Sequence, residues 1–306
     1  MNAVATGDPT APRAPVRVGT VETPDGAQLR YRIDGPLHSP LSPLLCSNGL
    51  GVATFFFHHL AERFSRTRAV ITWDYRGHGQ SPPPPDPEGL TVARCARDLW
   101  LVADACGAER PVLIGHSMGC QVLLEATRLS PQRPSALVPM LGVAGRALSS
   151  FFGGAALEGP IMVALELGAQ QPELVRRLTK TALAAPGMWT AVRALGLVHP
   201  DLCPREEFEP YFEHLGALDW RSYFALARDL VTHDASDLLD GLRLPVLVVA
   251  GERDLFTPRS RSDEMARAIA GARLLVIPGG SHAALIEQPE LVGDGLEKFL
   301  RDHALA

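Results

Sequence analysis

The chain has 306 residues, of which 46% are hydrophobic, and its formal net charge is −5. This length and apolar content can fill one large α/β domain, or one domain that carries an insertion. The negative charge and the lack of a Lys/Arg cluster argue against nucleic acid or an anionic lipid surface as a partner, so a small-molecule ligand is expected.

Residues 1–15 are rich in Ala, Pro and Thr and contain no apolar core segment, which predicts a flexible leader rather than a secretion signal. The five cysteines are widely spaced without a C-x-x-C pair, which favours neither a disulfide framework nor a zinc site, so a cytoplasmic location is expected. No membrane span is predicted, because Arg146 and Glu158 interrupt the most apolar region. The sequence does not indicate an oligomeric state.

An antiparallel hairpin is predicted where the folded part of the chain begins. Val16–Val21 and Ala27–Ile33 are strand-like segments on either side of a turn that runs from Thr23 to Gly26. A short glycine-containing turn between two such segments is typical of a hairpin.

After the hairpin, short apolar runs alternate with helix-like stretches. The apolar runs are Leu44–Ser47, Ala69–Trp73, Pro111–Gly115, Ala136–Leu141, Leu244–Ala250 and Arg273–Ile277. The helix-like stretches are Thr54–Phe64, Thr91–Cys106, Ser117–Leu129, Ser260–Ala270 and Pro289–Asp302. This alternation predicts an α/β fold with a mostly parallel, doubly wound sheet covered on both faces.

The alternation stops over residues 145–239, where helix-like segments occur without a convincing strand. The segments are Pro172–Ala185, Trp189–Leu197, Arg205–Leu215 and Trp220–Thr232. We expect an inserted helical cap here, with residues 16–144 and 240–306 forming the core, because insertions are tolerated at the carboxyl ends of strands where ligands bind. A separate helical domain unrelated to the site is the alternative.

A candidate nucleophile lies between a predicted strand and a predicted helix. Residues 115–119 read Gly-His-Ser-Met-Gly and place Ser117 at the turn between them. A G-x-S-x-G turn lifts a serine clear of the sheet edge on a strained backbone, and its glycines leave room for neighbouring main chain.

A serine nucleophile needs a general base and a carboxylate that orients the base. Asp254 lies in the loop after the apolar run that ends at Ala250, and His282 lies in the loop after the run that ends at Ile277. Both loops open on the same edge of a parallel sheet as Ser117, so we expect the three side chains to meet there.

The order Ser117, Asp254, His282 resembles that of the α/β-hydrolase fold superfamily, and residues 16–303 look like a capped serine hydrolase of this kind. The resemblance implies Ser117 as nucleophile, Asp254 as acid and His282 as base. The oxyanion hole would consist of the main-chain N–H groups of Met118 and Leu50. Leu50 lies in the segment Ser47-Asn48-Gly49-Leu50-Gly51, which resembles the enol-lactonase branch of the superfamily more than its His-Gly-x-Pro branch.

Other polar residues are candidates for the same roles. His116 adjoins the nucleophile, but neighbours across a sharp turn point apart. Glu252 is the rival of Asp254 at the end of the strand, and Asp234 and Asp237 are more distant rivals.

Five of the other histidines and one polar turn are not expected to take part in catalysis. His58 and His59 are expected to be half-exposed helix residues or to line the mouth of the pocket. His199, His214 and His233 have no acidic partner at metal-ligand spacing and are expected to be structural or solvated. In the turn from Asp74 to Ser81, hydrogen bonds of Asp74, Arg76 and His78 are expected to hold the turn.

Aromatic side chains of the cap could form an apolar pocket or pack as its core. They are Phe151, Phe152, Trp189, Tyr211, Phe212, Trp220, Tyr223 and Phe224. Tyr211 and Tyr223 resemble the paired cap tyrosines of epoxide hydrolases, but those relatives and the haloalkane dehalogenases use an aspartate nucleophile where this chain has Ser117.

The sequence therefore predicts a serine hydrolase that cleaves a small or medium carboxylic ester or lactone through an acyl-enzyme, with neither a cofactor nor a metal. Three alternatives remain open. They are a carbon-carbon bond hydrolase of ring-cleavage products, a cofactor-free haloperoxidase or perhydrolase, and a non-catalytic ligand-binding protein of the same fold.

Overall fold

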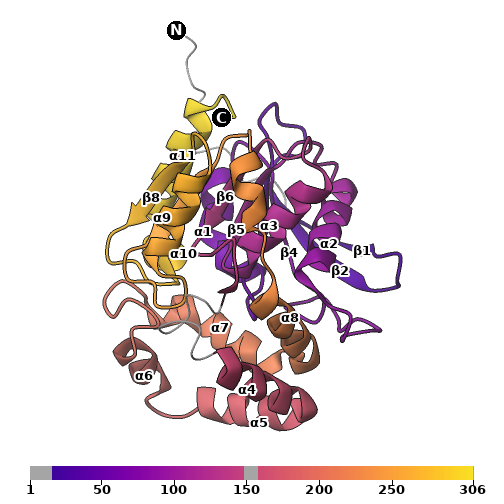
Figure 1. The fold of residues 1–306 in the computed structure, drawn as a ribbon, viewed down its shortest axis with the longest axis vertical. Helices are drawn as coiled ribbons and strands as arrows, with labels where there is room; N and C mark the ends of the chain where they lie inside the picture. The colour runs from indigo at the N-terminus through magenta and orange to yellow at the C-terminus, as the bar shows by residue number, and fades with distance from the viewer. Residues whose placement is uncertain (1–15, 148–157, 306) are drawn as a thin grey trace.

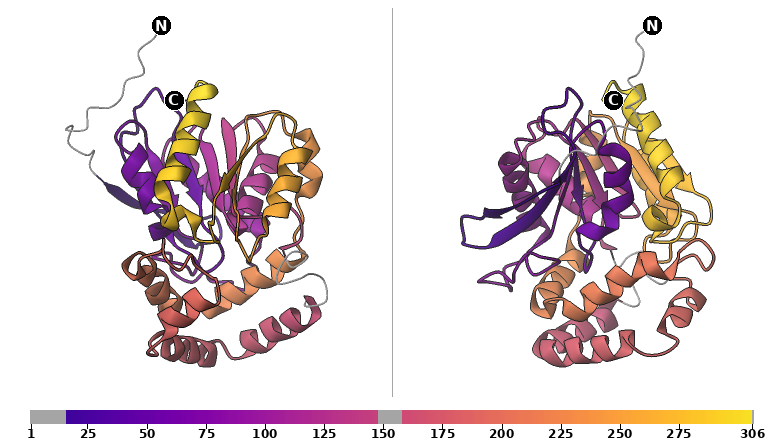
Figure 2. Two further views of the ribbon diagram at one scale, coloured as in Figure 1. Left: turned by 90° about the vertical axis from the view of Figure 1, so that its left-hand side faces the viewer. Right: turned by 180° about the vertical axis from the view of Figure 1, so that it is seen from behind.

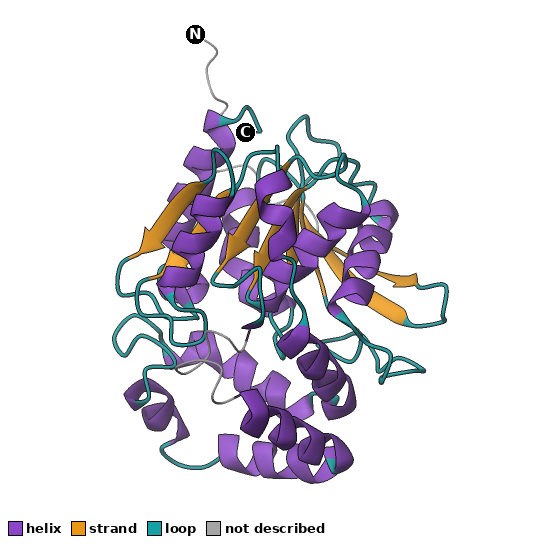
Figure 3. Ribbon diagram, viewed as in Figure 1, coloured by secondary structure: helices purple, strands orange, loops and turns teal. Residues whose placement is uncertain are grey.

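The computed structural model describes residues 16–147 and 158–305, and within them eight strands form one sheet in the order β1-β2-β4-β3-β5-β6-β7-β8 (Figure 1, Figure 3). The strands are β1 (Arg17–Glu22), β2 (Gln28–Asp34), β3 (Leu44–Ser47), β4 (Val70–Trp73), β5 (Val112–His116), β6 (Ala136–Met140), β7 (Leu247–Gly251) and β8 (Arg273–Ile277). Each corresponds to a predicted run, with bounds that differ by one to three residues at most ends.

The sheet is mixed at one edge and parallel elsewhere. The β1–β2 hairpin is antiparallel, as predicted, and β2 also pairs antiparallel with β4. All other neighbours are parallel, so the carboxyl ends of β3 to β8 lie at one edge. The register at the centre is set by Leu45, which pairs with Ile71 on one side and Leu113 on the other.

Helices cover both faces of the sheet (Figure 2). Helices α1 (His58–Phe64) and α11 (Pro289–Asp302) pack on one face, and α2 (Val92–Ala105), α3 (Met118–Leu129) and α9 (Arg259–Ala268) pack on the other. A 3₁₀ turn, η1 (Thr54–Phe57), precedes α1, and the short helix α10 (Ala284–Glu287) precedes α11. Successive strand residues alternate between the two core layers, so that Leu44 faces α1 and α11 while Leu45 faces α2 and α3.

The chain forms a group of helices after β6 and before β7. These helices lie beyond the edge at which the parallel strands end (Figure 1). They are α4 (Glu158–Gln170), α5 (Pro172–Leu183), α6 (Met188–Ala194), α7 (Arg205–Ala217) and α8 (Trp220–Thr232), followed by the 3₁₀ turn η5 (Ser236–Gly241). This arrangement confirms the predicted helical insertion. No helix among the described residues is long and apolar enough to cross a membrane.

Helix α4 was not predicted. Its sequence is apolar on every side and has glycine and proline in its first turn, so it shows neither helical periodicity nor a recognisable start. The predicted leader, residues 1–15, and the cap aromatics Phe151 and Phe152 lie outside the described residues.

Candidate active site

Ser117 is the single residue between the end of β5 and the start of α3. Its backbone has φ 54° and ψ −118°, a positive-φ conformation that is costly for a residue with a Cβ. The main-chain N–H of Ser117 donates to the carbonyl of Met140 at 3.0 Å, which ties the turn to the end of β6. The strained turn presents a half-buried serine at the carboxyl edge of the sheet.

The two glycines of the motif are required by close packing of main chain. A Cβ on Gly115 would lie 2.3 Å from the carbonyl oxygen of Gly119. A Cβ on Gly119 would lie 2.2 Å from the carbonyl oxygen of Ser47. The first turn of α3 therefore rests directly on β5 and on the end of β3, which brings Ser117 beside the loop that follows β3.

His282 and Asp254 form a hydrogen-bonded pair in the loops after β8 and β7. Nδ1 of His282 lies 2.8 Å from Oδ2 of Asp254, and the carboxylate is almost completely buried. Asp254 also accepts from the main-chain N–H groups of Phe256 at 2.8 Å and Thr257 at 2.9 Å, and from the Thr257 hydroxyl at 2.7 Å.

The surroundings of Asp254 favour its charged form. Burial acts to raise the pKa of this carboxyl, but the charge and hydrogen bond of His282 and the donors of Thr257 outweigh it and hold the pKa below its ordinary value. A buried carboxylate that stays ionised fixes the proton of His282 on Nδ1, which leaves Nε2 as the basic nitrogen.

The rival carboxylates are engaged elsewhere. Glu252 accepts from the main-chain N–H of Gly279 at 2.8 Å. Asp234 accepts from the N–H of Ser236 at 2.9 Å, and Asp237 pairs with Arg128 at 2.8 Å. Of the four candidates, the structure brings Asp254 to His282.

The loop after β3 lies against the serine turn. A Cβ on Gly49 would be 3.0 Å from the Cβ of Ser117, so the two segments touch. Asn48 anchors this loop, because its side-chain amide donates to the carbonyl of Trp73 at 2.7 Å and its own carbonyl accepts from the Tyr75 hydroxyl at 2.7 Å. An asparagine at this position therefore ties the loop to the end of β4.

The two predicted oxyanion donors flank this contact. Leu50 lies directly after Gly49 and lines the same cavity as Ser117. Met118 is the first residue of α3, so its N–H is one of the four at that helix end that no helical carbonyl accepts. Positive potential at a helix start is suited to a developing oxyanion.

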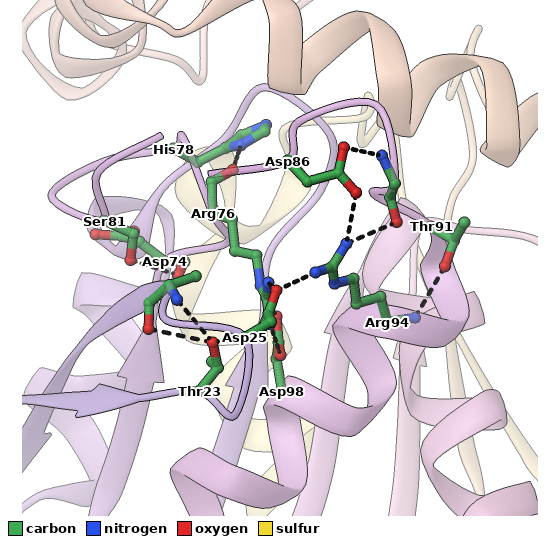
Figure 4. Close-up of polar contacts among 12 residues, drawn as sticks. Thr23, Asp25, Asp74, Arg76, His78, Ser81, Asp86, Thr91, Arg94 and Asp98 are labelled. Carbon is green, nitrogen blue, oxygen red and sulfur yellow. Dashed lines mark hydrogen bonds and ion pairs between the residues drawn. The ribbon is translucent and has the colours of Figure 1, made fainter. Parts of the chain in front are cut away.

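The polar turn after β4 is held by hydrogen bonds of Asp74, Arg76 and His78, as predicted (Figure 4). The carboxylate of Asp74 accepts from the main chain of Thr54 and Gln80, both at 2.9 Å. Arg76 makes a two-bond contact with Asp98 at 2.7 Å and also contacts Asp25 of the β1–β2 turn at 2.6 Å. None of these three acidic residues lines the cavity of Ser117 among the described residues.

His116 packs against His282, but its ring nitrogens are not positioned to act as the general base in its place. Its Nε2 donates to the main-chain carbonyl of His282 at 3.0 Å, and its ring lies 4.5 Å from that of Phe56. Burial lowers the pKa of His116 to about 3, so it is neutral at ordinary pH. Its contact supports the backbone that carries His282.

Ser117 and His282 share a cavity of about 380 Å³ between the sheet edge and the helical insertion. Its apolar walls are Leu50, Val52, Phe56, Ala147, Ile161, Leu165, Leu197, Phe208, Ala227, Leu230, Val231, Phe256 and Ala283, with the rings of Tyr211 and Tyr223 beside them. Among the described residues, no Asp, Glu, Lys or Arg lines it. Within the same residues no hydrogen bond joins the Ser117 hydroxyl to His282, a contact that often tightens only when substrate is bound.

Several supporting residues were missed by the sequence analysis. The ring of Phe256 packs at a tilt against His282 with ring centroids 5.0 Å apart, and the Thr257 hydroxyl is a further donor to Asp254. Buried Glu287 accepts from the N–H and hydroxyl of Ser281, next to His282, and from the N–H of His199 in the insertion. The signal that could have identified them is local. An aspartate in a loop often accepts from the main-chain N–H groups two and three residues later, as Asp254 does from Phe256 and Thr257.

The remaining histidines lie outside the cavity lining. His58 and His59 do not line it and instead contact Glu207 of α7. His233, which was expected to be structural or solvated, lies with its Nε2 3.2 Å from Glu125 of α3, a residue distant in sequence. His199 accepts from two main-chain N–H groups, and burial lowers the pKa of His214 to about 4.

Known proteins resemble this chain over most of its length. The model of the family described as "Alpha/beta hydrolase family" matches residues 44–294. The polyketide synthase ThaQ of Burkholderia thailandensis is 30% identical over 257 residues, or 82% of this chain, but the match spans only 11% of that protein. The putative carbamate hydrolase RutD of Azorhizobium caulinodans is 26% identical, over 89% of this chain and 95% of that protein.

A solved structure shares the whole architecture. The enol-lactonase from Burkholderia xenovorans LB400 superposes with a TM-score of 0.74 at 23% identity, covering 95% of this chain and 100% of that chain. At this identity the likeness concerns the fold.

Proposed function

Because this chain belongs to the alpha/beta hydrolase family, we propose that it is a serine hydrolase of small or medium, uncharged carboxylic esters or lactones. The observation that carries the proposal is the joint position of Ser117 and the His282–Asp254 pair on one apolar cavity. A serine on a strained turn, a histidine oriented by a buried carboxylate and main-chain N–H groups beside the serine are the parts that acyl transfer needs.

In the proposed reaction, Nε2 of His282 takes the proton of the Ser117 hydroxyl as the oxygen attacks the substrate carbonyl. The N–H groups of Leu50 and Met118 stabilise the oxyanion, and each such donor is worth about 10²- to 10³-fold in rate. His282 then donates its proton to the leaving alcohol oxygen, which gives an acyl-enzyme. A water molecule that loses its proton to His282 hydrolyses this intermediate.

The cavity supports an uncharged, largely apolar substrate. Its lining contains no ionic side chain among the described residues, and moving an unpaired charge into such surroundings is costly. Lactones are included because the segment from Ser47 to Gly51 resembles the enol-lactonase branch. All five cysteines are buried and free, which supports the reducing cytoplasm as the location.

The test is a panel of p-nitrophenyl esters of graded acyl length, lactones, carbamates and vinylogous diketones, assayed on wild type and on Ser117→Ala. We expect hydrolysis of medium-chain esters or lactones and a loss of at least about 10³-fold in kcat in the variant. Ser260→Ala is the matched control, since Ser260 is exposed on α9 and should keep full activity. Near-normal ester hydrolysis by Ser117→Ala would refute the proposal.

A serine-directed fluorophosphonate separates catalysis from mere binding. We expect it to label wild type at Ser117 and to leave Ser117→Ala unlabelled. A folded wild-type protein that binds esters but resists this probe would be a non-catalytic member of the family.

A further inference from the structure

Two histidines of the core and one carboxylate of the insertion converge away from the Ser117 cavity. His58 and His59 begin α1, and Glu207 lies in the first turn of α7. Nε2 of His58 is 2.9 Å from Oε2 of Glu207, and Nε2 of His59 is 3.4 Å from the same oxygen. One ligand atom from each of the three side chains lies within 4.8 Å of the other two.

The hydrogen bond at Nδ1 of His58 determines which role Nε2 of the same ring can take. Nδ1 of His58 lies 2.9 Å from the carbonyl oxygen of Phe55. A carbonyl only accepts, so Nδ1 carries the proton, and Nε2 of the neutral ring then presents a lone pair. That lone pair faces a carboxylate oxygen of Glu207, which is also an acceptor. A contact of 2.9 Å between these two atoms therefore needs either a proton or a metal ion between them.

A metal ion between these two atoms gives a familiar arrangement. Histidine ligands usually donate their second ring nitrogen to a main-chain carbonyl or a carboxylate, as His58 does to Phe55. The ring of His59 lies beside that of His58, with centroids 3.8 Å apart, so a second imidazole nitrogen is available on the same side. Two imidazole nitrogens and one carboxylate are a known donor set for zinc, with water completing the shell.

We propose that His58, His59 and Glu207 bind one divalent transition metal ion, with Zn²⁺ fitting the donor set best. The ion takes no part in the chemistry at Ser117 and the proposal stands independently of the reaction assigned there. Its role is to join α1 of the core to α7 of the insertion. The sequence shows no metal-ligand spacing here because Glu207 is remote from the histidines along the chain.

The site would affect the cavity through its neighbours in sequence. Phe56 precedes His58 by two residues and Phe208 follows Glu207 directly, and both phenylalanines line the cavity of Ser117. A metal held between α1 and α7 therefore sets the separation of two walls of the cavity. Metal removal should loosen the insertion without touching the reacting groups.

The experiment uses the full chain without a histidine tag, stripped with EDTA and then titrated with ZnCl₂ by calorimetry. We expect one Zn²⁺ per chain and a melting temperature that rises with the zinc concentration. Glu207→Gln and His59→Gln should weaken binding at least tenfold. The matched controls are Glu206→Gln, an exposed neighbour of Glu207, and His303→Gln near the end of α11, which should bind as wild type does.

A measurement on the unsubstituted protein keeps the test valid if a variant fails to fold. Zinc X-ray absorption of the loaded wild type should show imidazole nitrogens at about 2.0 Å together with oxygen. Absence of stoichiometric binding, a spectrum without imidazole, or equal affinity in Glu207→Gln and wild type would overturn the proposal. In those cases the contact is an imidazolium–carboxylate ion pair only.

Discussion

The sheet core and the helical insertion differ in how tightly their side chains are held. Every residue of β3, β4, β5 and β6 is buried. In the insertion, α5 has no buried residue, and Leu174 and Leu178 on it are 52% and 60% exposed. The core therefore provides fixed geometry, whereas the outer helices of the insertion gain little from packing.

The core and the insertion contribute different parts of the proposed site. Ser117, Asp254 and His282 directly follow or lie just beyond the core strands β5, β7 and β8, so their positions depend on the core. Much of the wall that faces them comes from the insertion, including Ile161 of α4 and Tyr223 of α8. Reaction chemistry should therefore be insensitive to changes in the outer insertion, while substrate choice should depend on its inner surface.

The largest effect is expected for Asp254→Asn in the core. The amide cannot hold the His282 proton on Nδ1 as a carboxylate does, so kcat should fall by about 10⁴-fold with little change in KM, as in other triads. The measurement is steady-state hydrolysis of the best ester or lactone from the panel.

Glu252→Gln is the matched control for that substitution. Glu252 lies two residues earlier on the same loop and contacts only the main chain of the neighbouring loop in the described structure. Its variant should keep kcat within a few fold. An Asp254→Asn enzyme of normal kcat, or an equal loss in Glu252→Gln, would contradict the assignment of Asp254.

The contrast also predicts that substituting alanine for a glycine at the same helix position changes the free energy of unfolding differently in the two regions. Gly119 and Gly159 are each the second residue of their helices, α3 in the core and α4 in the insertion. A Cβ on Gly119 would lie 2.2 Å from the carbonyl of Ser47, whereas one on Gly159 would meet nothing within 4 Å. Gly119→Ala should lower the free energy of unfolding by about 3 kcal/mol or more. Gly159→Ala should leave it unchanged or raise it by up to about 1 kcal/mol.

Urea unfolding followed by circular dichroism measures both variants. A Gly119→Ala protein as stable as wild type would mean that α3 does not rest on β3 as described. A Gly159→Ala protein destabilised by more than about 1 kcal/mol would mean that the start of α4 is packed more closely than the structure has it.

The core could be predicted from sequence because its signals are local. Buried parallel strands appear as short apolar runs, and Ser117, Asp254 and His282 each follow such a run at the edge of the sheet. The parallel order then brings together three loops that are far apart in the chain. The contact between Asp254 and His282 agrees with that expectation.

What could not be predicted depends on contacts between distant segments. Helix α4 is apolar on every side, so its residues Ile161 and Leu165 gave no periodic pattern, although both line the cavity. The carboxylate partners of His58 and His233 are remote in sequence, and only the fold brings Glu207 and Glu125 to them. Local sequence cannot encode pairings that are created when the insertion docks on the core.

The junction between the two regions should be sensitive to acid. Burial lowers the pKa of His78, in the core turn, to about 4, and it lowers the pKa of His214, on α7, to about 4. The two rings lie 6.2 Å apart. Between pH 6.5 and pH 4 the unfolded chain binds these protons and the folded chain does not, so stability falls as the pH falls through this window.

For buried His78 the loss is up to about 1.4 kcal/mol per pH unit. Asp254 does not contribute there, because its lowered pKa places its loss of stabilisation below its ordinary value of 3.8. Unfolding in urea at pH 7.5, 6, 5 and 4.5 measures the slope. His78→Gln should make the slope shallower if the variant folds, and His214→Gln provides the same test from the insertion, while the contribution of buried His116 remains in both variants. A slope unchanged in both variants would show that these histidines are protonated in the folded protein.

The smallest effect is expected on the outer face of the insertion. Leu178→Ala removes a side chain that is 60% exposed, so the free energy of unfolding should change by less than about 0.5 kcal/mol. The matched substitution in the core is Leu113→Ala, where the side chain is fully buried in the central strand and the cost should be about 2–5 kcal/mol. If Leu178→Ala cost as much as Leu113→Ala, α5 would be packed in solution against a surface that covers it. The two regions would then no longer differ in how firmly they are held, and substrate specificity could not be attributed to a loosely packed insertion.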